Sequence, residues 1–226
     1  FSDFSYRDRS WGEEDLSDKP AWVRHRSENF TDHIAIEDEF TRDQLRSLQA
    51  LDRAVNDTIN KLNEKVVLDK TVIIYVGDNG YQWGDHKQFK KGKPYDESVR
   101  VPFVIRIPSI EKNSVDALTI ATNDLPVTIL EIAGIDIESD GVSLVPLILK
   151  QQTKIRDYIL LENFLSMRTD DEERPIWAAI RTLNFKYIEY TTGEKEVYDL
   201  INDPYELESK HNNQDYAQIM QDLSNQ

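Results

Sequence analysis

The chain has 226 residues, of which 39% are hydrophobic and 10% aromatic, a composition that suits a globular protein with a buried core. It contains no cysteine, which excludes disulfides, thiolate metal sites and a cysteine nucleophile. Its 27 basic and 42 acidic side chains give a net charge of −15, and no apolar run approaches the ~20 residues of a membrane span, so we expect neither nucleic acid nor a membrane as a partner.

The first half of the chain predicts an irregular segment followed by a helix. Residues 1–38 are polar without a hydrophobic period, so we expect them to wrap over a larger body. Residues 41–64 carry apolar residues at spacings of three and four, which predicts a helix with one apolar face. Thr41 and Gln44 fit a capping box at its start. The apolar residues in question are Leu45, Leu48, Leu51, Val55, Ile59 and Leu62.

Two strands and a short helix are predicted next. Residues 71–76, TVIIYV, are apolar without alternation, which is typical of a strand buried on both faces of a parallel sheet. Residues 101–107 form a second candidate strand. The segment DLPVTILEIAG, residues 124–134, predicts a helix that Asp124 caps and Gly134 ends. A helix followed by a buried strand indicates an α/β layered fold.

Beyond residue 150 the pattern changes to short apolar runs, namely YILLENF, IWAAIRTL, FKYIEYTT and EVYDL. Successive short strands with polar or glycine-bearing breaks indicate an antiparallel sheet, and residues 216–223 predict a closing helix. We therefore expect two parts. Residues 1–150 would be an α/β portion, and residues 151–226 a small α+β subdomain with an antiparallel sheet and a C-terminal helix.

The tetrapeptide GDNG, residues 77–80, directly follows the first predicted strand. Ligands of open α/β sheets bind at the carboxyl ends of strands. Asp78 and Asn79 offer a carboxylate and an amide oxygen there, which are hard ligands that suit Ca²⁺ or Mg²⁺. A tight turn without a metal would explain the same four residues, because Asn-Gly is a turn signal by itself.

A cluster of basic residues follows within HKQFKKGKPY, in a chain that is otherwise acidic. Such a cluster is what an anionic substrate needs, although a solvated loop would also explain it. Lys91, twelve residues after Asn79, and His86 are the candidates for chemistry in this cluster. A lone histidine is more often a surface or packing residue than a catalyst.

Together, GDNGYQWGDH and KKGKPYDESVRVPFVIRIP resemble the C-terminal signature of the sulfatase family, in the alkaline-phosphatase-like superfamily. That signature has a Ser/Thr-Asp-Asn/His-Gly turn, a Gly-acid-His element, and a lysine before Tyr-Glu-Glu-Ser and Val-Pro. The similarity covers nearly the whole chain. It continues through SDKPAWVR and LRSLQALDRAVNDTINKL upstream, and LPVTILEIAGI, DGVSLVPLI, AIRTLNFKYIEY and EVYDLINDPYELES downstream.

The resemblance implies an alkaline-phosphatase-like fold with a mostly parallel sheet, and hydrolysis of a sulfate ester, either a sulfated glycan or an aryl sulfate. Asp78 and Asn79 match the pair that binds the family's divalent cation, usually calcium, with Mg²⁺ as the alternative. Lys91 matches a lysine that contacts the sulfate group or its bridging oxygen. His86 falls in the Gly-acid-His element, whose role varies among members. Gly77 replaces the usual Ser or Thr, a departure that should leave metal binding unaffected.

The family's nucleophile is missing from this chain. It is a formylglycine made from Cys or Ser in a Cys/Ser-x-Pro-x-Arg motif, and neither that motif nor the family's first aspartate pair occurs here. The chain also begins at Phe1, without a signal sequence, and its compartment is not readable. We therefore expect the C-terminal part of a sulfatase, inactive in isolation, with the formylglycine in the missing N-terminal part. The alternatives are a phosphodiesterase or phosphonate monoester hydrolase of the same superfamily, and an inactive fragment or pseudo-enzyme module.

Overall fold

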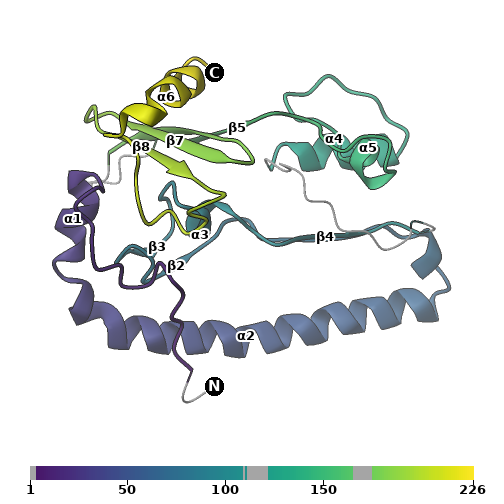
Figure 1. The fold of residues 1–226 in the computed structure, drawn as a ribbon. Helices are drawn as coiled ribbons and strands as arrows, with labels where there is room; N and C mark the ends of the chain where they lie inside the picture. Colours follow the sequence, from purple (N-terminus) through teal and green to yellow (C-terminus); the bar gives the residue numbers. More distant parts are fainter. Residues whose placement is uncertain (1–3, 109, 111–121, 165–174) are drawn as a thin grey trace.

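The computed structural model describes residues 4–108, 110, 122–164 and 175–226 (Figure 1). The helices are α1 (Ala21–Ser27), α2 (Phe30–Glu64), α3 (Asp96–Val99), α4 (Asp124–Ile132), α5 (Val145–Ile148) and α6 (Ala217–Ser224), with 3₁₀ turns at η1 (Leu68–Lys70) and η2 (Gln214–Tyr216). The strands are β1 (Ile73–Val76), β2 (Gln82–Trp83), β3 (Phe89–Lys90), β4 (Phe103–Arg106), β5 (Ile159–Asn163), β6 (Trp177–Arg181), β7 (Phe185–Tyr190) and β8 (Lys195–Asp199).

The long helix α2 runs along the base of the molecule and confirms the helix predicted over residues 41–64 (Figure 1). It begins at Phe30, however, so the expected capping box at Thr41 is wrong. Thr41 lies inside the helix, where its hydroxyl donates to the Glu37 carbonyl at 2.8 Å. The irregular segment expected up to residue 38 is also wrong from residue 21 onward. Trp22 and Val23 of this segment pack in the core cluster and Phe30 stacks on Phe89, so long-range contacts that leave no local apolar period support its helices.

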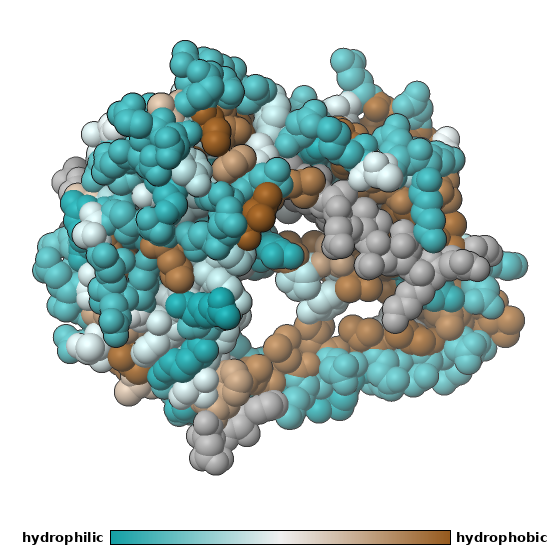
Figure 2. All heavy atoms as spheres, viewed as in Figure 1, coloured by the Kyte–Doolittle hydropathy of each residue, from teal (hydrophilic) through white to brown (hydrophobic). Residues whose placement is uncertain are grey.

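One face of α2 is apolar and uncovered in the described structure. Leu48 is 50% exposed, Leu51 42%, Val55 38% and Ile59 37%. Figure 2 shows apolar side chains along the upper edge of α2, facing an opening between this helix and the layer above it. The amphipathic pattern therefore predicted the helix correctly but not the burial of its face. No helix in the described ranges is both long enough and apolar enough to cross a membrane.

Strands β1 and β4 confirm the two strands predicted near residues 71–76 and 101–107, and they pair antiparallel with Ile74 opposite Ile105. The expected burial of β1 on both faces is wrong in the described structure, since Tyr75 of β1 is 38% exposed and its partner Val104 of β4 is 61% exposed. The reason is that the described residues do not cover both faces of this two-stranded ribbon with a second layer. The expected mostly parallel sheet is wrong for the described residues, since every strand pair among them is antiparallel, whereas the mixed α/β class is confirmed.

The second half contains the predicted antiparallel sheet, in the order β5-β6-β7-β8, and the predicted closing helix. Leu223 of α6 packs on one face with Ile180 and Val197. The other face is covered from the first half of the chain, by a cluster that includes Trp22 and Tyr95. The boundary at residue 150 stays a prediction.

Helix α4 confirms the predicted helix near residues 124–134, and Gly134 ends it with φ +75° and amide donation to the Glu131 carbonyl at 2.9 Å. Asp124 does not cap it, contrary to expectation. Its buried carboxylate instead accepts the Val142 amide at 2.8 Å and the Arg156 guanidinium at 2.5 and 2.6 Å. A long-range ion pair therefore replaces the local cap.

Candidate functional site

The GDNG turn (residues 77–80) is attached at both ends to the chain around β4. The Gly77 amide donates to the Pro102 carbonyl at 3.2 Å, and the Gly80 amide donates to the Ser98 carbonyl at 3.0 Å. Asp78 is exposed, and its Oδ1 accepts the Asn79 amide at 2.9 Å. The two oxygen-bearing side chains therefore lie on a turn with fixed ends, directly after β1.

The chain returns to this turn through the β2–β3 hairpin and the lysine loop, which we define as residues 91–93. Lys91 Nζ donates to Asn79 Oδ1 at 2.8 Å. The two signals that were separate in the sequence, an acid–amide turn and a lysine twelve residues later, thus meet in space. An ammonium beside a carboxylate and an amide oxygen can hold an anionic group next to a bound cation.

The donor set at the turn fits part of a hard-cation site. Ca²⁺ takes six to eight oxygen ligands and Mg²⁺ six, whereas Asp78 and Asn79 supply two oxygen-bearing side chains. An amide oxygen has two lone pairs, so Asn79 Oδ1 can accept from Lys91 and still face a cation. Within the described residues no group of three or more acidic or histidine side chains could hold a metal ion. The remaining ligands would therefore come from water, substrate or further polypeptide.

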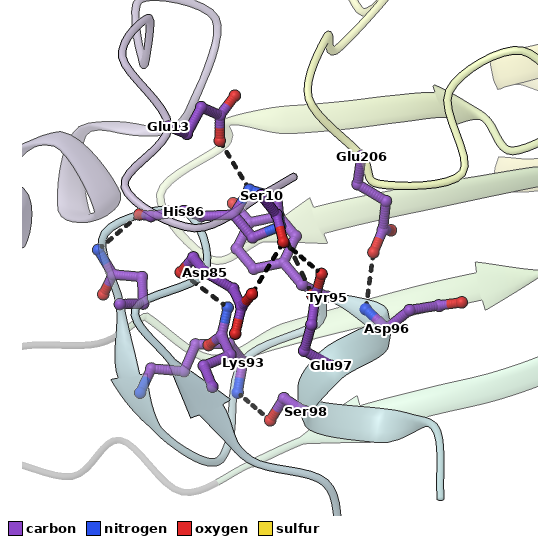
Figure 3. Close-up of polar contacts among 12 residues, drawn as sticks. Ser10, Glu13, Asp85, His86, Lys93, Tyr95, Asp96, Glu97, Ser98 and Glu206 are labelled. Carbon is purple, nitrogen blue, oxygen red and sulfur yellow. Dashed lines mark hydrogen bonds and ion pairs between the residues drawn. The ribbon is translucent and has the colours of Figure 1, made fainter. Parts of the chain in front are cut away.

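His86 lies in a buried cluster of acidic side chains (Figure 3). Its Nδ1 is 2.7 Å from Glu13 Oε2, and its Nε2 is 3.6 Å from Glu97 Oε2. The side chain is 0% exposed, and the backbone adopts φ +52°. The structure therefore brings Lys91 to Asn79, the neighbour of Asp78 in the GDNG turn, but encloses His86 between two carboxylates.

The buried cluster extends from His86 to Ser10 and Asp85. The Ser10 hydroxyl lies 2.9 Å from both Asp85 Oδ1 and Glu97 Oε1. Burial, together with the charge of Glu97, raises the pKa of Asp85 to about 6. Burial alone would lower the pKa of His86, but its contacts with Glu13 and Glu97 outweigh burial and raise that pKa to about 9. A charged imidazole between two carboxylates joins the N-terminal segment to α3.

This pairing predicts a pH-dependent stability. The pKa of His86 is about 9 in the folded chain and about 6.5 when unfolded, so the imidazolium contributes fully below about pH 6.5 and its contribution is lost as the pH rises through 9. We expect a loss on the order of 3 kcal/mol in the free energy of unfolding between pH 6 and 10. Urea denaturation at both pH values measures it.

His86→Gln should remove most of this pH dependence, whereas His25→Gln should retain it because the His25 side chain is 83% exposed. Equal pH dependence in His86→Gln and the unmodified chain would show that the imidazole is not held as a cation. The comparison of His86→Gln with His25→Gln cancels the contributions of other buried groups that titrate at lower pH, such as Asp85.

Four residues of the site were not predicted from the sequence, namely Glu13, Asp85, Glu97 and Ser98. The last two lie within the Tyr-Asp-Glu-Ser run, which the family resemblance marks but which carries no periodic signal of its own. A short polar run between a basic cluster and a strand would be expected to form an exposed turn. Only the tertiary structure shows that Tyr95 and Ser98 of this run are buried, and that the run contacts both the GDNG turn and the lysine loop.

Comparison with known proteins shows the family. The family model described as Sulfatase matches residues 7–135, and the model described as N-sulphoglucosamine sulphohydrolase, C-terminal, matches residues 84–226. This chain belongs to the sulfatase family. An arylsulfatase from Volvox carteri is 34% identical over 227 residues, which cover 86% of this chain and 35% of that protein.

Two solved structures share the fold. One is an enzyme in complex with its substrate D-glucosamine-2-N,6-O-disulfate, 29% identical, with a TM-score of 0.74 over 84% of this chain and 40% of that chain. The other is the phosphonate monoester hydrolase of Agrobacterium radiobacter, 26% identical, with a TM-score of 0.65 over 77% of this chain and 37% of that chain. This chain therefore spans less than half the length of these relatives.

Proposed function

We propose that this chain supplies part of the active site of a sulfuric ester hydrolase, a sulfatase that acts on a sulfated glycan or an aryl sulfate. The observation that supports this most directly is the 2.8 Å contact between Lys91 Nζ and Asn79 Oδ1, beside the exposed carboxylate of Asp78. It joins an anion-binding group to a pair of hard oxygen ligands at the end of a strand. Membership of the sulfatase family gives that arrangement its reaction class.

In this proposal the side chains have separate tasks. Asp78 and Asn79 hold a divalent cation, Ca²⁺ or Mg²⁺, which when bound neutralises charge on the sulfate oxygens. Lys91 places its ammonium at the transferred group or the bridging oxygen, where negative charge grows as the ester bond breaks. His86 does not contact the substrate in this proposal, because its two ring nitrogens face Glu13 and Glu97 inside the protein.

The nucleophile must come from outside this sequence. The chain contains no Cys/Ser-x-Pro-x-Arg motif, the source of the family's formylglycine. We propose that the isolated chain does not turn over sulfate esters, and that activity requires the additional length found in its relatives. The substrate proposal follows the relatives as well, since one is an arylsulfatase and another binds a sulfated glucosamine.

A second candidate is hydrolysis of a phosphonate monoester or phosphodiester. The likeness to the phosphonate monoester hydrolase supports it, since the same acid–amide turn and lysine can serve a phosphoryl group. Both family models are sulfatase models, which favours the sulfate ester. A panel of aryl sulfate, sulfated glucosamine, phosphonate monoester and phosphodiester substrates on the complete enzyme separates the two.

Calcium binding tests the proposed cation site without turnover. Asp78→Ala should weaken Ca²⁺ binding at least about tenfold in a calorimetric titration, because it removes the only charged ligand of the pair. Asp57→Ala on the exposed face of α2 removes the same charge and should change affinity by less than about twofold. Equal affinity in Asp78→Ala and the unmodified protein would refute the assignment of the cation site.

A further inference from the structure

Ser98 of α3 contacts both the GDNG turn and the lysine loop of the candidate site. Its carbonyl oxygen accepts the Gly80 amide at 3.0 Å, at the end of the GDNG turn. Its hydroxyl oxygen accepts the amides of Gly92 at 2.9 Å and Lys93 at 3.2 Å, within the lysine loop. We propose that Ser98 is a positioning residue that sets the spacing between the GDNG turn and the lysine loop, an inference that rests on the function proposed above.

The lysine loop is held from two sides. The Gly92 carbonyl accepts Asn163 Nδ2 at 2.9 Å and Trp177 Nε1 at 3.2 Å, from strands β5 and β6. Its amide donates to Ser98, and its φ of +88° lies in the region that favours glycine. The peptide unit between Gly92 and Lys93 is therefore held on both edges, by its carbonyl and by the Lys93 amide, and the Lys91 side chain extends from the residue just before it.

The GDNG turn approaches α3 so closely that only glycine fits at its end. A Cβ on Gly80 would lie 2.1 Å from the Glu97 carbonyl oxygen and 2.8 Å from the Ser98 carbonyl carbon. Both neighbouring atoms belong to the backbone, so neither can rotate away. The close approach lets the Gly80 amide reach the Ser98 carbonyl.

Helix α3 is a rigid support because Asp96, Glu97 and the preceding Tyr95 reach three different buried groups. The Tyr95 hydroxyl donates to Glu196 at 3.2 Å, and the Asp96 carboxylate accepts Lys186 Nζ at 2.5 Å. Glu97 extends into the buried cluster around His86. Three consecutive residues thus anchor the one turn of helix that carries the serine, which is itself only 4% exposed.

The two contacts of Ser98 are separable by mutation. Ser98→Ala removes the hydroxyl and leaves the carbonyl in place. We expect amide hydrogen exchange at Gly92 and Lys93, measured by NMR on this chain, to accelerate at least about tenfold while exchange at Gly80 stays within about twofold. In the complete enzyme kcat/KM should fall about 10–100-fold, as is common when a supporting hydrogen bond is lost. The Kd for Ca²⁺ should change by less than about threefold.

Gly80→Ala should give the converse result. The added Cβ displaces the GDNG turn from the Ser98 carbonyl, so we expect Ca²⁺ binding to weaken at least about tenfold in the titration described above. Exchange at Gly92 should stay within about threefold of the unmodified chain, because the serine hydroxyl is untouched.

Two further variants control for general loss of structure. Ser209 is a buried serine whose hydroxyl accepts the Val197 amide at 3.2 Å in the sheet, so Ser209→Ala should leave Gly92 exchange and Ca²⁺ binding unchanged. Ser98→Thr retains a hydroxyl and should restore slow exchange at Gly92. Unchanged exchange at Gly92 in Ser98→Ala, or equal acceleration in Ser209→Ala, would overturn the proposal.

These readouts also separate this inference from the proposed function. Amide exchange reports the opening of backbone hydrogen bonds and does not depend on turnover, so it can support the role of Ser98 even if the complete enzyme has no sulfatase activity. Conversely, a sulfatase whose Gly92 exchange is unaffected by Ser98→Ala would retain the proposed function and refute the positioning role.

Discussion

Lys91→Ala should lower kcat of the complete enzyme toward a sulfate ester by about 10²–10³-fold, the usual cost of removing one charge-stabilising donor. The ammonium lies 2.8 Å from Asn79 Oδ1, where it can meet a transferred group held at the acid–amide turn. Without it, the charge that develops during bond cleavage loses the ammonium that lies at Asn79. Initial rates on an aryl sulfate measure the effect.

Calcium affinity distinguishes a chemical role for Lys91 from a structural one. The lysine is not a cation ligand, and its removal relieves repulsion between two positive charges, so Ca²⁺ should bind Lys91→Ala no more weakly than the unmodified protein. Lys90→Ala removes the same charge from the exposed neighbouring residue and should keep kcat within about twofold. A Lys91→Ala enzyme with an unchanged rate would rule out the proposed role.

Lys186→Met should lower the free energy of unfolding by about 3–5 kcal/mol, the typical cost of removing one partner from a buried ion pair. Lys186 Nζ is fully buried and lies 2.5 Å from Asp96 Oδ1 and 2.6 Å from Glu206 Oε1. Burial would raise the pKa of Asp96, but Lys186 and Arg181 outweigh it and lower that pKa to about 2. Methionine keeps most of the length of the side chain, so the loss reports the missing charge.

Lys195→Met is the matched control in the same sheet. Its ammonium pairs with Glu189 at 3.0 Å, but the side chain is 45% exposed, and we expect a loss below about 1 kcal/mol. Urea denaturation of both variants at pH 7 gives the comparison. If Lys186→Met lost no more stability than Lys195→Met, the buried ion pairs of Lys186 with Asp96 and Glu206 would not be a main support of α3.

The local elements of this protein were predictable from its sequence. Apolar spacings predicted α2, the stop signal at Gly134 helped to predict α4, and short apolar runs separated by turns predicted the four-stranded sheet that α6 follows. The GDNG turn and Lys91 were identified as candidates because their residue types suit hard cations and anions. These signals are readable because each depends on residues a few positions apart.

Other features were decided by tertiary structure alone. The antiparallel pairing of β1 with β4, the exposure of the apolar face of α2, and the burial of His86 between Glu13 and Glu97 all depend on segments far apart in the chain. The same holds for Ser98, whose two contacts lie in different loops. A sequence pattern describes which side chains are available. Where each one lies, and which charge or amide it meets, depends on long-range packing that has no local periodic signature.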